Sequence, residues 1–136
     1  MENTLYINSG RTCFEVFCGG NGAASACFEK GYRLASDCRE PLFRLLLRST
    51  TDFSETEMTS LEGWDGVFFE KTASGTAFSF SCESRGLVVR LNAGCDEKND
   101  SVAWTVELVN TSPEYAVVWL EYPRFCYKTD ENACLF

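Results

Sequence analysis

Hydrophobic and polar residues alternate along residues 101–123, SVAWTVELVNTSPEYAVVWLEYP, and this pattern predicts two strands joined by a turn. Trp104, Val106 and Leu108 occupy every second position, which is the period of a strand with one buried face. The segment Asn110–Pro113 is typical of a turn, because Asn and Ser side chains bond their own backbone and proline fixes φ. The stretch carries almost no reactive side chains, so we predict that its role is structural.

Short runs rich in β-branched and aromatic residues recur along the rest of the chain, separated by Gly, Asn, Asp and Ser. The predicted strands are Thr4–Asn8, Arg11–Cys18, Ala23–Glu29, Leu42–Ser49, Gly66–Lys71, Thr76–Cys82, Leu87–Asn92, Val102–Val109 and Ala116–Tyr122. The best helical candidate, Asp52–Leu61, lacks the continuous apolar stripe of an amphipathic helix. We therefore predict an all-β fold, an antiparallel β-sandwich of about nine or more strands.

Several of these strands have one apolar and one polar face, which indicates the side chains of the core. The predicted core residues are Phe14, Val16, Phe43, Leu45, Leu47, Phe78, Phe80, Leu87, Val89, Leu91, Trp104, Val106, Leu108, Val117 and Trp119. The strand Ala116–Tyr122 differs because it is apolar on both faces. It is predicted either to lie centrally beneath other material or to face a partner, which would be a catalytic domain or a second copy of the chain.

Composition narrows the class of protein. A chain of 136 residues with 45% hydrophobic and 14% aromatic residues can bury a core, and residues 1–136 are predicted to form one domain. The net charge of −8 argues against nucleic acid and anionic membranes as partners, because phosphate binding needs a basic face. The N-terminus lacks the features of a signal peptide, and the longest apolar run, Leu45–Leu47, is too short to span a bilayer. We expect a cytoplasmic protein.

The spacing of the cysteines favours a role in packing the core over a role in metal binding. The eight are Cys13, Cys18, Cys27, Cys38, Cys82, Cys95, Cys126 and Cys134. They form no CxxC pair, and the chain has no histidine to complete a mixed zinc site. We predict reduced, mostly buried thiols that pack as small hydrophobic side chains. A metal site built from four cysteines of distant strands is the alternative interpretation.

The usual catalytic groups are missing. Without histidine there is no Ser-His-Asp or Cys-His nucleophile system and no imidazole metal ligand. Gly19–Gly22 is followed by no Lys-Ser/Thr pair, so it is predicted to be a hairpin turn and not a phosphate loop. The acidic run Asp96–Asp100 lacks the glycine and terminal glutamate of a calcium loop and is predicted to be a solvated turn. We predict no catalytic residue, no metal and no cofactor.

Two carboxylates would suffice for glycoside hydrolysis, so an enzyme that uses carboxylates alone stays a hypothesis. The candidates are Glu62, Asp65, Glu70 and Glu121, each in a predicted turn or on the polar face of a strand. The sequence does not show whether two of them converge.

Trp64 and Asp65 are the candidate carbohydrate-binding residues. They lie in the segment 61–66, LEGWDG, where a ring can stack on a sugar while a carboxylate accepts hydrogen bonds from its hydroxyls. In the other interpretation, which we favour, Trp64 plugs the end of the sandwich.

Four stretches together resemble a known family. They are LYINSGRTCFEVFCGGNGAASACF, EPLFRLLLRS, GTAFSFSCESRGLVVRLNAG and SVAWTVELVNTSPEYAVVWLEYPRF, with Asn110 in a turn and Pro123 at the end as the most telling positions. The pattern resembles the N-terminal β-sandwich (supersandwich) domain of bacterial glycoside-hydrolase-like proteins, which precedes a (β/α)₈ catalytic barrel. In that family the catalytic carboxylates lie in the barrel, so the resemblance assigns no catalytic role to any residue of this chain.

The resemblance implies a non-catalytic accessory domain that packs on a catalytic module or helps to position glycan. The family's sandwich is usually longer than this chain, so the chain would be a truncated or N-terminal part of a larger protein. A stand-alone lectin-like carbohydrate-binding module is the alternative. We expect the isolated chain to lack hydrolase activity and to bind sugars weakly or not at all.

Overall fold

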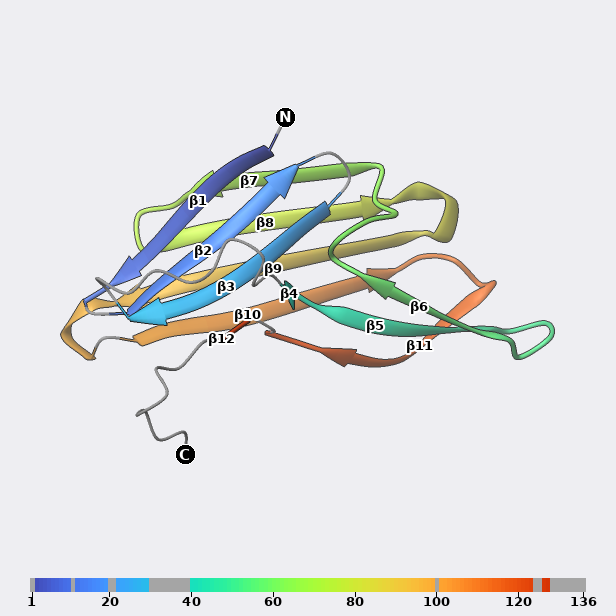
Figure 1. The fold of residues 1–136 in the computed structure, drawn as a ribbon. Helices are drawn as coiled ribbons and strands as arrows, with labels where there is room; N and C mark the ends of the chain where they lie inside the picture. Colours follow the sequence, from blue (N-terminus) through green and yellow to red (C-terminus); the bar gives the residue numbers. More distant parts are fainter. Residues whose placement is uncertain are drawn as a thin grey trace.

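The computed structural model describes residues 2–10, 12–19, 22–29, 40–99, 101–123 and 126–127, and these residues form three sheets (Figure 1). Sheet A contains β1 (Glu2–Ser9), β2 (Thr12–Gly19), β3 (Gly22–Glu29), β4 (Glu40–Pro41) and β12 (Cys126–Tyr127). Sheet B contains β5 (Arg44–Ser49), β6 (Glu55–Thr59) and β11 (Tyr115–Glu121). Sheet C contains β7 (Gly66–Lys71), β8 (Gly75–Cys82), β9 (Leu87–Asp96) and β10 (Ser101–Asn110).

The prediction of an all-β, antiparallel protein is confirmed. All nine predicted strands are present, and each neighbouring pair is antiparallel except β12, which runs parallel to β3. The helical elements of the described residues are the short 3₁₀ turns Glu83–Arg85 and Glu97–Asn99. None of the helices in this part of the chain is long and apolar enough to cross a membrane.

The segment Asp52–Leu61, the best helical candidate in the sequence, forms strand β6 and its flanking turns. Strand β6 pairs with β5, and each glutamate of β6 lies beside an arginine of β5. Glu57 Oε1 is 3.2 Å from Arg44 Nε, and Glu55 Oε2 is 3.8 Å from Arg48. These cross-strand contacts, which the sequence of β6 alone does not show, favour the hairpin over a helix.

The core lies between the sheets (Figure 1) and receives side chains from all three. Phe43, Trp64 and Phe80 pack edge to face around one another, with ring centroids 4.9 to 5.6 Å apart. Phe14 of β2 makes a similar contact with Trp104 of β10 at 5.2 Å. Each such pair adds about 0.5–1.5 kcal/mol to the effect of burial. These aromatic contacts fix sheets A and C, and the segments joined to sheet B, around one core.

Most of the predicted core is buried. The confirmed residues are Phe14, Val16, Phe43, Leu45, Leu47, Phe78, Phe80, Leu87, Val89 and Leu91. Trp104, Leu108 and Val117 are partly buried and pack against this cluster. The buried hydrophobic residues that were not predicted to be buried are Ile7, Leu42, Met58 and Ala93, and the core also contains Trp64 and the thiols of Cys18 and Cys82.

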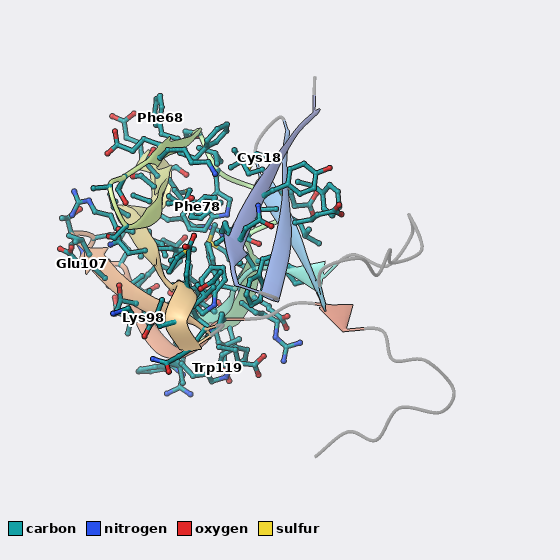
Figure 2. All side chains as sticks on the ribbon, turned by 90° about the vertical axis from the view of Figure 1, so that its left-hand side faces the viewer. Cys18, Phe68, Phe78, Lys98, Glu107 and Trp119 are labelled. Carbon is teal, nitrogen blue, oxygen red and sulfur yellow. The ribbon has the colours of Figure 1, made fainter. Side chains whose placement is uncertain are left out.

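Two of the core predictions are wrong. Val106 is 40% exposed because β10 is an edge strand of sheet C, so its inner face is only partly covered. Trp119 lies on the outer side of sheet B (Figure 2). The Arg44 guanidinium carbon lies over its ring, 5.3 Å from the ring centroid. The pairing of β11 with β5 shifts between Val117 and Trp119, and this bulge sends Leu120 toward the core in place of Trp119.

Candidate functional site

Trp64 and Asp65, the residues predicted to bind carbohydrate, point in different directions. The Trp64 side chain is only 1% exposed, and its Nε1–H donates to the Thr59 carbonyl oxygen at 2.9 Å. The Asp65 side chain accepts a hydrogen bond from the Glu83 backbone N–H at 2.6 Å, at the start of the 3₁₀ turn after β8. No face of the Trp64 ring is open to a sugar. The stacking surface expected there does not exist in this structure, whereas the plug interpretation agrees with it.

The contacts of the candidate catalytic carboxylates are with other groups of the protein. Glu121 lies 3.0 Å from Arg44 on sheet B. Asp65 lies just before β7, and Glu70 lies near the end of that strand. The two residues are roughly 17 Å apart along an extended chain. Paired carboxylates in glycoside hydrolysis stand roughly 5–10 Å apart. Glu62 is exposed in the loop before β7. None of these contacts brings two of the four together.

Residues 96–99 of the acidic run form a turn whose own donors bind the Asp96 carboxylate. The Asp96 carboxylate accepts hydrogen bonds from the Lys98 backbone N–H at 3.2 Å and the Asn99 side-chain amide at 2.7 Å. Within the part of the chain that the structure describes, no group of three or more Cys, Asp and Glu side chains could hold a metal ion.

Three cysteines can be placed, and all three carry free thiols. Cys18 and Cys82 are buried, and Cys95 is half-buried. Burial raises the pKa of the Cys95 thiol, and the Lys71 charge opposes this shift. Such a thiol is mostly protonated at neutral pH and reacts slowly. The other five predicted thiols have side chains that lie outside the described residues.

The outer face of sheet C carries a feature that the sequence interpretation did not identify. Opposed residues of an antiparallel pair point to the same side of a sheet, so the register defines this face. One row across it contains Phe68, Ser79, Arg90 and Glu107, and the next contains Glu70, Ala77, Asn92 and Thr105. A third row contains Gly66, Ser81, Val88 and Val109.

These rows form a trough along β8. The middle strand contributes only the small side chains of Ala77, Ser79 and Ser81. The larger side chains on either side are Phe68 and Glu70 of β7 and Val88, Arg90 and Asn92 of β9. The two flanking strands are two strand spacings apart, about 10 Å. A hollow of about 450 Å³ follows from this contrast, and its lining residues are Phe68, Phe69, Glu70, Ala77, Phe78, Ser79, Arg90, Leu91 and Asn92. Its volume falls within the range of ligand-binding clefts.

Phe68 is the most prominent side chain of this trough. It is 72% exposed and projects away from the body of the protein, whereas Phe78 points between the sheets (Figure 2). The ring leans along β7 over Gly66: a Cβ atom added at Gly66 would lie 3.4 Å from Phe68 Cε2. Gly66 therefore leaves the space that this ring occupies. An exposed aromatic ring beside a hollow is a surface on which a flat apolar group can pack.

The polar groups of the trough come from its walls and its floor. Arg90 Nη1 is 3.3 Å from Glu107 Oε1, and both side chains are exposed. Exposed ion pairs of this kind contribute only about 0–1 kcal/mol, so Arg90 can exchange Glu107 for a ligand at little cost. Glu70, Asn92 and Ser79 add a carboxylate, an amide and a hydroxyl around the same hollow. The trough thus offers both hydrogen-bond donors and acceptors beside an aromatic ring.

Fold and trough together define an all-β protein of packed antiparallel sheets with an open, mixed polar and aromatic surface on one sheet. Comparison with known protein families, with curated proteins and with solved structures found no match to this chain.

Proposed function

We propose that this chain is a non-catalytic carbohydrate-binding β-sandwich, and that the trough on the outer face of sheet C is its binding site. The observation that carries this proposal is the exposed Phe68 ring beside a hollow whose floor is Ala77 and Ser79. The electron-rich face of an aromatic ring attracts the C–H groups of a sugar ring, and the surrounding polar side chains suit its hydroxyls.

The position of the trough on a sheet face supports a sugar over a peptide. A peptide that adds to a sheet binds at an edge, where backbone N–H and C=O groups are unpaired. The backbone groups beneath this trough are used within sheet C, because β8 is paired on both sides. Only side chains are left to bind a ligand, which favours one rich in hydroxyls. The net charge of −8 disfavours a nucleic acid.

The resemblance of the sequence to the N-terminal sandwich of glycoside-hydrolase-like proteins supports an accessory role. An antiparallel all-β architecture is what this resemblance implies. In this role the domain would hold or position glycan while a separate catalytic module performs hydrolysis. We expect weak binding, with Kd on the order of 1 mM, and no hydrolase activity in the isolated chain.

Calorimetry with cellohexaose, mannohexaose, xylohexaose and maltohexaose tests the proposal. At least one sugar should bind, and Phe68→Ala should weaken that binding roughly tenfold. Phe53→Ala is the matched control, because Phe53 is 71% exposed but lies in the turn between β5 and β6. Absence of binding to all four sugars, or equal losses in both variants, would contradict the proposed site.

A second candidate role is association through sheet B, as predicted from the apolar strand Ala116–Tyr122. The observation that favours it is Val118, which is 41% exposed at the bulge of β11 beside the outward-facing Trp119. Sedimentation velocity tests association with a second copy of the chain. A dimer that Val118→Glu abolishes would support it, with Val106→Glu on β10 as a control of similar exposure. A monomer at every concentration would contradict association between copies.

A further inference from the structure

A second hollow lies farther along the same face of sheet C. Its volume is about 290 Å³, and its lining residues are Ser81, Cys82, Glu83, Gly86, Leu87, Val88 and Thr111. Ser81 belongs to the floor of the trough and follows Ala77 and Ser79 on β8. We name the first hollow the Phe68 hollow and the second the Thr111 hollow.

The two hollows lie in line. The floor residues Ala77, Ser79 and Ser81 extend over about 14 Å of strand, at roughly 3.4 Å per residue. The Phe68 ring leans toward the row of Gly66 and Ser81, so it stands where one hollow gives way to the other. Both hollows open on the same face and are joined by a floor of small side chains. A length of about 14 Å exceeds a single sugar ring.

The chemistry of the two hollows differs. The Phe68 hollow has an aromatic wall with Arg90, Asn92 and Glu70 around it. The Thr111 hollow has the Glu83 carboxylate and the Thr111 hydroxyl, which donates to the Gly86 carbonyl oxygen at 3.2 Å. Gly86 has φ +64°, and a Cβ atom there would lie 2.8 Å from the Ser112 backbone nitrogen. Because Gly86 has no side chain, Ser112 can pack against it and close this end of the trough. Stacking is available in the first hollow and hydrogen bonding in the second.

We infer that the Phe68 hollow and the Thr111 hollow are successive subsites for one extended glycan chain that lies along β8. The inference rests on the proposed carbohydrate-binding function and specifies its ligand: an uncharged oligosaccharide of several units, not a single sugar or a chain end. The first subsite stacks a sugar ring on Phe68. The second binds the hydroxyls of a ring farther along the chain.

Calorimetry with sugars of increasing length tests this inference. The sugars are glucose, mannose and xylose, the oligomers of each from two to six units, and the maltose series. Affinity should rise at least about tenfold, equivalent to roughly 1.4 kcal/mol, between the single sugar and the longer oligomers and then become constant. Equal affinity for the monosaccharide and the hexaose would overturn the inference and leave the proposed function standing. No binding by any of these sugars would overturn both.

A matched pair of variants isolates the second subsite. Val88 and Val109 lie in the same row of sheet C and are both half-buried, but only Val88 lines the Thr111 hollow. Val88→Phe should fill that hollow and lower the affinity for a hexaose about tenfold while the affinity for a disaccharide stays unchanged. Val109→Phe should change neither. Equal effects of the two variants, or equal losses for both sugars in Val88→Phe, would overturn the assignment of two subsites.

Discussion

The two faces of β8 differ in burial and in the size of their side chains. On the inner face Phe78, Phe80 and Cys82 are all buried. On the outer face Ala77, Ser79 and Ser81 are half-exposed and small, and they form the floor of the trough that runs from the Phe68 hollow to the Thr111 hollow. The period-two alternation of one strand therefore supplies both the bulk of the core and the open space of the proposed site. Substitutions on the inner face should affect folding, whereas those on the outer face should affect binding.

The largest effect is expected at Phe80, which is fully buried and contacts the rings of Phe43 and Trp64. Truncation in Phe80→Ala should lower the free energy of unfolding by roughly 3–5 kcal/mol, because it removes buried area and leaves a cavity. Urea denaturation measures this change. Phe68→Ala, on the opposite face of the sheet, should cost less than about 0.5 kcal/mol. A loss below about 1 kcal/mol in Phe80→Ala would mean that the two faces are assigned the wrong way round.

The next largest effect is expected at Trp64. In Trp64→Phe the Thr59 carbonyl oxygen loses its donor and part of the indole volume is left empty, so unfolding should become easier by about 1–3 kcal/mol. Sugar binding should be retained in conditions where the variant is folded. Binding that disappears while the urea midpoint stays unchanged would place the site at Trp64 and remove it from sheet C.

A smaller effect should appear at alkaline pH through Tyr122. Burial raises the pKa of its phenol above the ordinary value of 10.0. The folded state therefore favours the protonated form, so the stability that this group contributes is complete below pH 10.0 and is lost as the pH rises above it. The Tyr122→Phe variant should lose less stability than the wild type between pH 9 and pH 11.5, which urea denaturation at a series of pH values measures. Parallel curves for the two proteins would contradict this account of Tyr122.

The sequence predicts most of the fold because period-two alternation is a local property. Prediction from the sequence fails where contacts with neighbouring strands determine which way a side chain points or whether a strand forms. The bulge between Val117 and Trp119 adds one residue, and a one-residue shift reverses the faces of every later side chain. Strand β6, with the sequence ETEMT, has almost no apolar alternation and is stabilised by contacts with the arginines of β5.

The candidate site was harder to predict than the fold. Val67, Phe68 and Phe69 are three consecutive apolar residues, so the sequence of β7 does not say which of them faces outward. The register against Ser79 and Arg90 decides it, and this is a property of the assembled sheet. Trp64 has glycine and carboxylate neighbours that are typical of a surface turn, but its ring packs in the core, in agreement with the interpretation of Trp64 as a plug. The small residues Ala77, Ser79 and Ser81 were the available signal for a trough.

Mapping of a bound sugar by NMR shows directly whether the trough on sheet C is the binding site. The ¹⁵N-labelled chain would be titrated with whichever of the four hexaoses binds in calorimetry, and the shifts of its backbone amides followed. The proposed site predicts that the largest changes cluster at Phe68, Ser79, Arg90 and Asn92, with smaller changes near Thr111 at the far end of the trough. Changes confined to the loop around Asp65, or to the outer face of sheet B, would contradict it.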